Sequence, residues 1–307
     1  MHRITSKVLQ TGALLALSVA FWAAAAPSNC AAQSIAAAGS PAATAAVSAL
    51  RRETCVYKRV GTNELKLVII KPAGWQAKDR DPAILLFHGG GWVWGTPGIM
   101  GSQGNYFARR GMVSVLVQYR LLDKNAKAPP TVCVADAKSA LRWVRAHAGE
   151  LGVDVNRIAA GGGSAGGHLA AFLGLMNGLD DPLDDLTVSA KANALVLWNP
   201  VFDNSPGQWG HELVGDRYKE FSPAQNITSN APPTIIFLGT EDKLIPVKTV
   251  KTFQANMQAA GVRCETFFYE GQGHGFFTKQ PWHAQTLLEA DRFLVSLGWL
   301  KAAPAGE

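Results

Sequence analysis

The sequence predicts an α/β domain with a mainly parallel central sheet and helices on both faces. Short apolar runs rich in Val, Ile and Leu alternate with segments of helical length through residues 56–300, which is the pattern of strand and helix units in parallel sheets. Most of these runs are continuously apolar, as expected for strands covered on both faces. The chain has 307 residues, of which 48% are hydrophobic and 17% are charged, a balance that supports one large core.

The N-terminal segment is expected to lie outside this core. Basic residues open the chain, an apolar stretch follows at 12–26, and small residues come next, which is typical of a secretory signal peptide. We predict residues 1–32 as this peptide, with cleavage after Ala32 or after Ala26. The alternative, an uncleaved anchor, is disfavoured because no basic cluster follows the apolar stretch. We therefore expect a periplasmic or extracellular protein with no stable membrane span after cleavage.

Residues 33–49 are predicted to form a linker, because Ala, Ser, Gly and Pro dominate them. Residues 50–307 are then expected to form the single domain. The formal net charge of +6 comes from scattered Lys and Arg, and no nucleic-acid-binding motif accompanies it. We therefore expect no nucleic-acid partner.

The cysteines bear on the redox chemistry of the exported chain. Removal of residues 1–32 takes Cys30 away and leaves Cys55, Cys133 and Cys264, so at most one disulfide is expected among these three. The sequence leaves the pairing open. Cys133 is expected in the core as a small buried residue.

The first half of the domain is punctuated by turn residues. Two β-branched runs separated by Gly61-Thr-Asn63 predict a hairpin at the sheet edge. Asp81-Pro82 precedes a buried strand, and Pro129-Pro130 precedes a segment whose apolar residues recur with a helical period. The elements expected here are strands at 56–60, 65–71, 83–87 and 112–118, and helices near 106–110 and at 132–148.

The second half continues the alternation of strands and helices. Neither an internal repeat nor a second core is visible, so we expect one domain, with functional groups at the carboxyl ends of its strands. The elements expected here are strands at 156–161, 194–199, 234–239 and 264–269, and helices at 165–177, 247–260 and 283–300.

Ser164 falls on the turn between a predicted strand and a predicted helix. The segment Gly162-Gly-Ser164-Ala-Gly166 matches the G-x-S-x-G nucleophile elbow, whose glycines remove side chains that would collide at a strained turn. The elbow holds a serine hydroxyl out at the carboxyl edge of the sheet.

The same glycines allow a second interpretation. Gly161, Gly163 and Gly166 satisfy the G-x-G-x-x-G fingerprint of dinucleotide-binding sites. That fingerprint requires an acidic residue at the end of the next strand, about 20 residues on. Asp184 and Asp185 have this spacing but precede the next apolar run, so the elbow is favoured.

A glycine-rich segment, His88-Gly-Gly-Gly-Trp92, directly follows another buried strand. Glycines let backbone N–H groups approach an oxygen that a Cβ would block. Such donors stabilise the oxyanion of an acyl-transfer intermediate by about 3 to 4 kcal/mol. We assign the amides of Gly89, Gly90 and Ala165 to this oxyanion hole, and we expect His88 to shape the loop by hydrogen bonding.

Two further strand ends supply a carboxylate and an imidazole. Asp242 follows the strand at 234–239, and His274 follows the strand at 264–269. The carboxylate can fix the tautomer of the histidine, which then serves as general base towards a serine. We predict Ser164, Asp242 and His274 as the catalytic residues, in the chain order expected for α/β-hydrolases.

These motifs resemble the α/β-hydrolase superfamily, more closely its esterase and lipase group with the HGGGW oxyanion loop. The resemblance covers about residues 65–300 and includes Tyr119-Arg120-Leu, Asp136-Ala-x-x-Ala-Leu-Arg-Trp143 and Asp154-x-Asn156-Arg157-Ile. It implies the α/β-hydrolase fold and a serine carboxylic-ester hydrolase that uses no metal and no organic cofactor.

The sequence departs from one branch of this group. Hormone-sensitive-lipase-like members carry a helical cap built from a long N-terminal region and an insertion after the sixth strand. Here the insertion at 201–231 is modest, so we expect no full cap domain and a more open site. The chain is more similar to the compact secreted acetylesterase and feruloyl-esterase-like branch.

Four aromatic residues near strand ends, Trp92, Trp94, Trp198 and Phe276, are predicted to bind substrate, because aromatic faces stack on sugar rings or enclose acyl chains. With export and an open site, they favour short acyl esters of small molecules or polysaccharides, such as acetyl esters. Two alternatives are a peptidase of the prolyl-oligopeptidase type, which usually carries a propeller domain, and a noncatalytic cholinesterase-like binding module.

Overall fold

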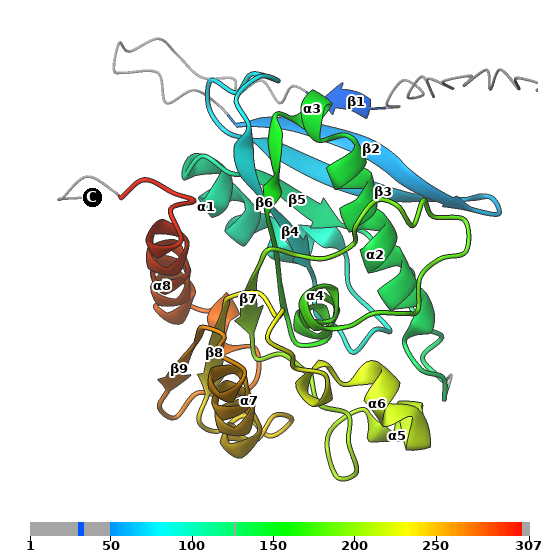
Figure 1. Cartoon of the computed structure of the whole chain (residues 1–307), viewed down its shortest axis with the longest axis vertical. Coiled ribbons are helices and arrows are strands. Elements are labelled where there is room, and N and C mark those ends of the chain that lie inside the picture. The colour runs from blue at the N-terminus through cyan, green and yellow to red at the C-terminus, as the bar shows by residue number, and fades with distance from the viewer. Residues whose placement is uncertain (1–29, 34–49, 126, 303–307) are drawn as a thin grey trace, which may run out of the picture.

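The computed structural model describes residues 30–33, 50–125 and 127–302, and a nine-stranded sheet forms the centre of this part of the chain. The strands are β1 (Cys30–Gln33), β2 (Arg51–Val60), β3 (Asn63–Lys71), β4 (Asp81–Phe87), β5 (Val113–Val117), β6 (Val153–Gly163), β7 (Ala194–Trp198), β8 (Thr234–Gly239) and β9 (Cys264–Tyr269). Their order across the sheet is β1-β2-β3-β5-β4-β6-β7-β8-β9 (Figure 1). Neighbouring strands in the series β5-β4-β6-β7-β8-β9 pair in parallel. At the other edge, β1, β2 and β3 pair antiparallel, and β3 pairs antiparallel with β5.

Helices cover both faces of this sheet. On one face lie α1 (Gly101–Arg109) and α8 (Trp282–Ser296); on the other lie α2 (Thr131–Ala146), α4 (Ala165–Leu175) and α7 (Val247–Ala259), with α3 (Ala148–Leu151) between α2 and β6. The predicted α/β-hydrolase architecture is confirmed. The predicted strands and helices are all present, with ends that differ by a few residues.

The continuously apolar strands serve two separate cores. Along β4, Leu85 and Phe87 enter the core beneath α2, α4 and α7, whereas Ile84 and Leu86 enter the core beneath α1 and α8. All four side chains are fully buried, and each contributes about 1.5 to 3 kcal/mol by leaving water. Successive side chains of a strand point to opposite faces of the sheet. Each buried strand is therefore anchored in both cores, which fixes the position of its carboxyl end.

The N-terminal edge of the sheet differs from the prediction. β1 pairs antiparallel with β2, and Cys30 forms a disulfide with Cys55, which lies opposite it in the register. Cys133 and Cys264, the other cysteines considered as partners of Cys55, are both free and buried. Burial raises the pKa of each of these two thiols to about 12.

This edge also bears on the predicted signal peptide and linker. A boundary at residue 32 runs through β1 and separates Cys30 from its partner. Most of the two predicted segments, residues 1–29 and 34–49, lies outside the described residues. Within the described part of the chain, no helix has the length and hydrophobicity needed to cross a membrane.

The segment of residues 199–233 between β7 and β8 forms no full cap over the described domain. Its helices have only three or four residues each, and they are α5 (His211–Val214), η2 (Gly215–Arg217), α6 (Tyr218–Phe221) and η3 (Pro223–Gln225). In Figure 1 they lie at the lower right, beyond α4. This agrees with the modest insertion expected from the sequence.

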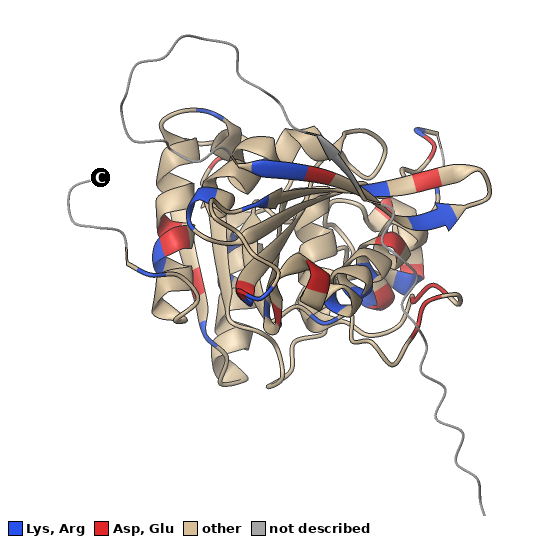
Figure 2. Cartoon of the chain, turned by 90° about the horizontal axis from the view of Figure 1, so that it is seen from above, with Lys and Arg blue, Asp and Glu red and all other residues tan. Residues whose placement is uncertain are grey.

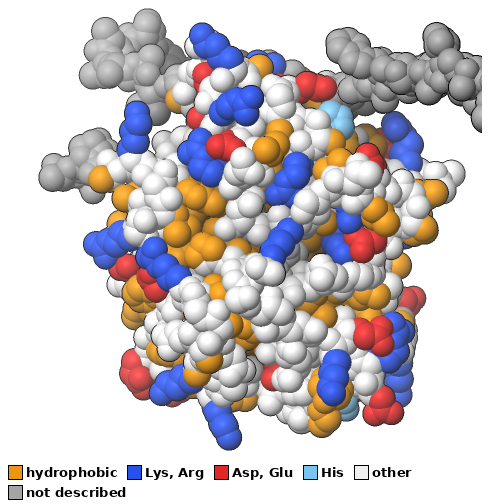
Figure 3. All heavy atoms as spheres, viewed as in Figure 1, with side chains coloured by type: hydrophobic (Ala, Val, Ile, Leu, Met, Phe, Trp, Pro, Cys, Tyr) orange, Lys and Arg blue, Asp and Glu red, His pale blue; other side chains and the backbone are white. Residues whose placement is uncertain are grey.

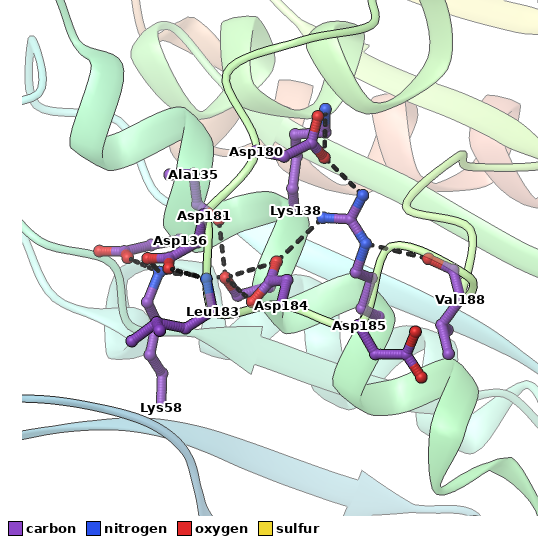
Figure 4. A network of polar contacts seen from close by, with 12 residues as sticks. Lys58, Ala135, Asp136, Lys138, Asp180, Asp181, Leu183, Asp184, Asp185 and Val188 are labelled. Carbon is purple, nitrogen blue, oxygen red and sulfur yellow. Dashed lines mark hydrogen bonds and ion pairs between the residues drawn. The ribbon is translucent and has the colours of Figure 1, made fainter.

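A network of ion pairs holds the segment after α4 against α2 and β2 (Figure 4). Asp136 of α2 has no exposed side-chain area and binds Lys58 of β2 at 2.8 Å and Arg120 at 2.7 Å. The other pairs join Asp180 to Lys138, Asp181 to Lys58 and Asp184 to Arg142. Asp184 is therefore a structural residue in the described chain, and it does not end a strand as the dinucleotide interpretation requires.

Charged residues of both signs are interspersed over the ribbon (Figure 2). On the face drawn in Figure 3, hydrophobic side chains form patches that polar and charged groups interrupt. This scattered distribution matches the pattern seen in the sequence.

Candidate active site

Ser164 lies on a strained turn between β6 and α4. Its φ of 54° and ψ of −121° belong to a backbone region that residues with a side chain rarely adopt. The turn lies close to β4, since a Cβ added to Gly166 would meet the carbonyl oxygen of Phe87 at 2.1 Å. Glycine is therefore required at this position, and the half-buried Ser164 side chain is held at the carboxyl edge of the sheet.

His274 is hydrogen-bonded to both other residues predicted as catalytic. Its Nε2 lies 2.8 Å from Oγ of Ser164, and its Nδ1 lies 2.8 Å from Oδ2 of Asp242. The three side chains follow β6, β8 and β9, which lie close together in the sheet. The structure thus brings together three residues that span 110 positions of the sequence.

The Asp242 carboxylate is held in one orientation by the backbone. Its Oδ1 accepts the N–H groups of Leu244 at 2.9 Å and Ile245 at 3.0 Å, which leaves Oδ2 for His274. The Asp242 side chain is fully buried, while 24% of the His274 side chain is exposed. A carboxylate at Nδ1 favours the tautomer in which Nε2 can accept a proton from Ser164.

Gly89 and Gly90 follow β4 beside the elbow. A Cβ on Gly89 would lie 3.3 Å from Cβ of Ser164. Gly90 has a φ of 119°, and a Cβ there would meet the carbonyl oxygen of Trp94 at 2.1 Å. Gly90 is therefore required, whereas a side chain at Gly89 would make tight contacts with the elbow.

The N–H groups of this region lack protein acceptors within the described residues. Neither Gly89 nor Gly90 donates a backbone hydrogen bond, and Ala165, as the first residue of α4, has no acceptor inside its helix. The N–H groups of Gly89, Gly90 and Ala165 therefore have no backbone acceptor among the described residues.

His88 supports the loop, as the sequence suggested. Its Nδ1 lies 2.7 Å from the carbonyl oxygen of Gly89, and its ring stacks on Tyr119 with centroids 4.4 Å apart. The hydroxyl of Tyr119 donates to the carbonyl oxygen of His88 at 2.8 Å. Burial lowers the pKa of His88, which keeps the ring neutral and suited to this hydrogen-bonding role.

Two of the four predicted substrate-binding aromatics are core residues. Trp198 is fully buried and stacks on both Phe237 and Phe277. Phe276 is 3% exposed and packs on Tyr269 with ring centroids 4.8 Å apart. Neither ring presents an exposed face, because other side chains pack against both of them.

The other two aromatics lie in the loop after β4. Trp92 is fully buried and contacts Trp209 and His168, with ring centroids 5.2 and 5.0 Å away, so it also presents no surface to a ligand. Trp94 is 59% exposed, and its ring packs beside Gly90. Of the four residues, Trp94 alone offers an exposed aromatic face near the elbow.

Four of the hollows on the described chain have volumes of about 470 to 540 Å³, and none of these four is lined by Ser164, Asp242 or His274. The first of these lies between α2 and residues 173–191, away from the serine.

Asn199, which belongs to none of the sequence motifs, lies beside His274. Asn199 directly follows β7, and its Oδ1 accepts the N–H of Gly275 at 3.1 Å. A polar residue directly after an apolar strand, at the same sheet edge as Ser164, was the signal available in the sequence.

Comparisons with known proteins indicate the family of the chain. The BD-FAE family model matches residues 68–206, and the model of the dienelactone hydrolase family matches residues 205–303. The apo form of esterase 2 from Thermogutta terrifontis is 45% identical and has a TM-score of 0.78, with coverage of 82% of this chain and 97% of that chain.

Curated relatives are more distant. Esterase LipC of Mycobacterium tuberculosis is 29% identical over 259 residues, which are 74% of this chain and 62% of that protein. The acetylxylan esterase of Xylanibacter ruminicola is 28% identical over 221 residues, which are 66% of this chain and 41% of that protein. The chain spans about half the length of the curated relatives it matches. Its likeness to nearly the whole of a solved esterase shows that the chain belongs to the carboxylic ester hydrolases of the α/β-hydrolase fold.

Proposed function

We propose that this chain hydrolyses short-chain carboxylic esters through an acyl-enzyme formed on Ser164. The observation that carries the proposal is the continuous pair of 2.8 Å contacts from Ser164 through His274 to Asp242. In this proposal Ser164 is the nucleophile, His274 the general base and acid, and Asp242 the group that orients the imidazole.

Acylation begins when Nε2 of His274 takes the proton of Ser164 as Oγ bonds to the ester carbonyl carbon. The negative charge that develops on the carbonyl oxygen is stabilised by the N–H groups of Gly89, Gly90 and Ala165. The C–O bond to the alcohol then breaks, and the alcohol leaves with the proton from Nε2. Water repeats these steps on the acyl-enzyme, which releases the acid and restores Ser164.

Short acyl groups are favoured by two observations. Esterase 2 of Thermogutta terrifontis has been solved with propionate and with butyrate bound. In this chain the segment between β7 and β8 contains only helices of three or four residues and forms no full cap, which supports a site that small esters reach directly. The exposed ring of Trp94 can stack on a sugar ring, which makes acetylated carbohydrate the candidate natural substrate.

Export belongs to the same proposal. A disulfide persists in oxidising compartments such as the periplasm or the extracellular space, and the Cys30–Cys55 disulfide therefore supports export. Retention of this disulfide requires a cut before Cys30, so cleavage after Ala26 replaces the boundary at residue 32. Edman sequencing of the secreted chain tests this, and a first residue after Cys30 would contradict it.

A panel of p-nitrophenyl esters with acyl chains of two to twelve carbons tests the substrate class. We expect kcat/KM to be largest for the shortest members and to fall steeply beyond butyrate. Aminoacyl anilides in the same assay test the peptidase alternative, and no turnover of any ester would favour a binding module. A maximum at long acyl chains would contradict the proposed substrate class.

A further inference from the structure

Asn199 lies between the nucleophile and the imidazole at the carboxyl edge of the sheet. It follows β7, whose last residue, Trp198, is opposite Gly163 of β6 and Phe237 of β8 in the strand register. Its own N–H donates to the carbonyl oxygen of Phe237 at 2.7 Å. The backbone at Asn199 is thus fixed between the strands that lead to Ser164 and to Asp242.

The side chain of Asn199 is fully buried, and its backbone has a φ of 33°. Asn tolerates this left-handed region better than most residues with a side chain. A buried amide requires hydrogen-bond partners, and both ends of this amide are directed at the histidine loop. Oδ1 accepts the N–H of Gly275 at 3.1 Å, and Nδ2 lies 3.5 Å from Nε2 of His274.

The Gly275 N–H determines which end of the amide faces His274. If the amide were rotated by 180°, its NH₂ group would meet the Gly275 N–H, and two donors would oppose each other. The oxygen therefore faces Gly275, and the NH₂ group faces Nε2. A donor beside Nε2 favours the tautomer with the hydrogen on Nδ1, since a hydrogen on Nε2 would face a second N–H.

We propose that Asn199 is a positioning residue that holds the His274 loop through Gly275 and keeps Nε2 of His274 free to accept the proton of Ser164. The proposal rests on the proposed function of the three residues. Besides Asn199, two side chains are hydrogen-bonded to His274: the hydroxyl of Ser164 from the elbow and the carboxylate of Asp242 from the loop after β8. Among the described residues, no other charged side chain is hydrogen-bonded to this imidazole.

Two variants separate the two contacts of Asn199. Asn199→Gly removes the whole side chain and still allows the positive φ. Asn199→Asp keeps an acceptor for Gly275 but places an anion beside Nε2, which stabilises the protonated imidazole. Asn193→Gly is the matched control, because Asn193 precedes the other end of β7 and its Oδ1 likewise accepts a backbone N–H, that of Ile158 at 3.2 Å.

Steady-state kinetics with p-nitrophenyl acetate from pH 5 to pH 9 test the proposal. We expect Asn199→Gly to lower kcat by about 10-fold or more with KM within about twofold, because a displaced general base impairs chemistry and leaves binding intact. We expect Asn199→Asp to move the acid limb of the kcat/KM profile upward by about 1 pH unit or more. Asn193→Gly is expected to leave both readouts unchanged.

Wild-type kcat in Asn199→Gly, or an unmoved acid limb in Asn199→Asp, would overturn the proposal. If Asn199→Gly does not fold, as judged by circular dichroism and melting temperature, the acid limb of Asn199→Asp decides alone. Ser164→Ala, assayed in parallel, distinguishes the two levels of inference. Full activity in Ser164→Ala refutes the proposed function itself, whereas an inactive Ser164→Ala beside unaffected Asn199 variants refutes only the role of Asn199.

Discussion

Replacement of Asp242 by Asn is expected to abolish most activity through the tautomer of His274. The oxygen of the new amide must stay at the Oδ1 position, because the N–H groups of Leu244 and Ile245 donate there at 2.9 and 3.0 Å. The NH₂ group then takes the Oδ2 position, 2.8 Å from Nδ1 of His274. Facing a donor, Nδ1 becomes an acceptor and the proton moves to Nε2, so Nε2 no longer accepts the proton of Ser164.

The size of this effect follows from the same geometry. Rotation of the new amide by 180° would restore the tautomer, but it would place the NH₂ group against the two backbone N–H groups that donate at the Oδ1 position. This rotation is therefore disfavoured. Loss of the correct tautomer in a serine triad costs about 10⁴-fold in kcat, which corresponds to about 5 kcal/mol of transition-state stabilisation.

The assay is kcat/KM for p-nitrophenyl acetate at neutral pH, with melting temperature as the test of folding. Glu241→Gln is the matched control, because it removes a neighbouring carboxylate that is exposed and does not contact His274. We expect the control to retain wild-type activity and both variants to keep a native melting curve. More than a tenth of wild-type activity in a folded Asp242→Asn variant would refute this account of the imidazole.

Three further predictions concern stability. Cys55→Ser opens a loop of 25 residues and should lower the free energy of unfolding in urea by about 3 kcal/mol through a gain of chain entropy in the unfolded state. Asp136→Ala leaves Lys58 and Arg120 without their buried partner and should cost about 3 to 5 kcal/mol in the same assay. Burial lowers the pKa of His168 to about 4. Between pH 6.5 and pH 4, His168 is therefore protonated in the unfolded chain but neutral in the folded chain. Stability should therefore fall by up to about 3 kcal/mol between pH 6.5 and pH 4, and His168→Gln should flatten this dependence.

Each of these predictions has a contrary result. Equal stability of Cys55→Ser and the oxidised wild type would show that the disulfide does not constrain the unfolded chain. Asp185→Ala is the control for Asp136→Ala, because Asp185 is exposed and bonds only within its own turn; equal losses in the two variants would contradict the role of the buried network. An unchanged slope of stability against pH in His168→Gln would exclude His168 as its source.

The strands, and the three residues predicted as catalytic, were predictable because local sequence patterns determine them. Continuous apolar runs occur where both faces of a strand are covered, as along β4. Ser164, Asp242 and His274 each follow such a run, and parallel strands bring their carboxyl ends to one edge of the sheet.

The features that the sequence did not predict depend on long-range contacts. β1 has the sequence Cys-Ala-Ala-Gln, which contains no β-branched residue, so its pairing is determined by β2 and the disulfide. The contact of Asn199 with Gly275 joins residues 76 positions apart. Trp198 lies at a strand end as predicted, but the sequence did not reveal that its ring points to the face covered by Phe237 and Phe277.

Covalent labelling of the nucleophile tests the central claim most directly. Esterase 2 of Thermogutta terrifontis is phosphorylated by paraoxon, and mass spectrometry of peptides locates such an adduct on this chain. Ser102, whose Oγ lies 2.9 Å from Nε2 of His283, is an internal control for a serine that merely contacts a histidine. We predict one diethylphosphoryl group per chain, on Ser164, with loss of esterase activity in proportion, and no adduct in Ser164→Ala. Complete inactivation with the adduct on any other residue, Ser102 included, would contradict the account.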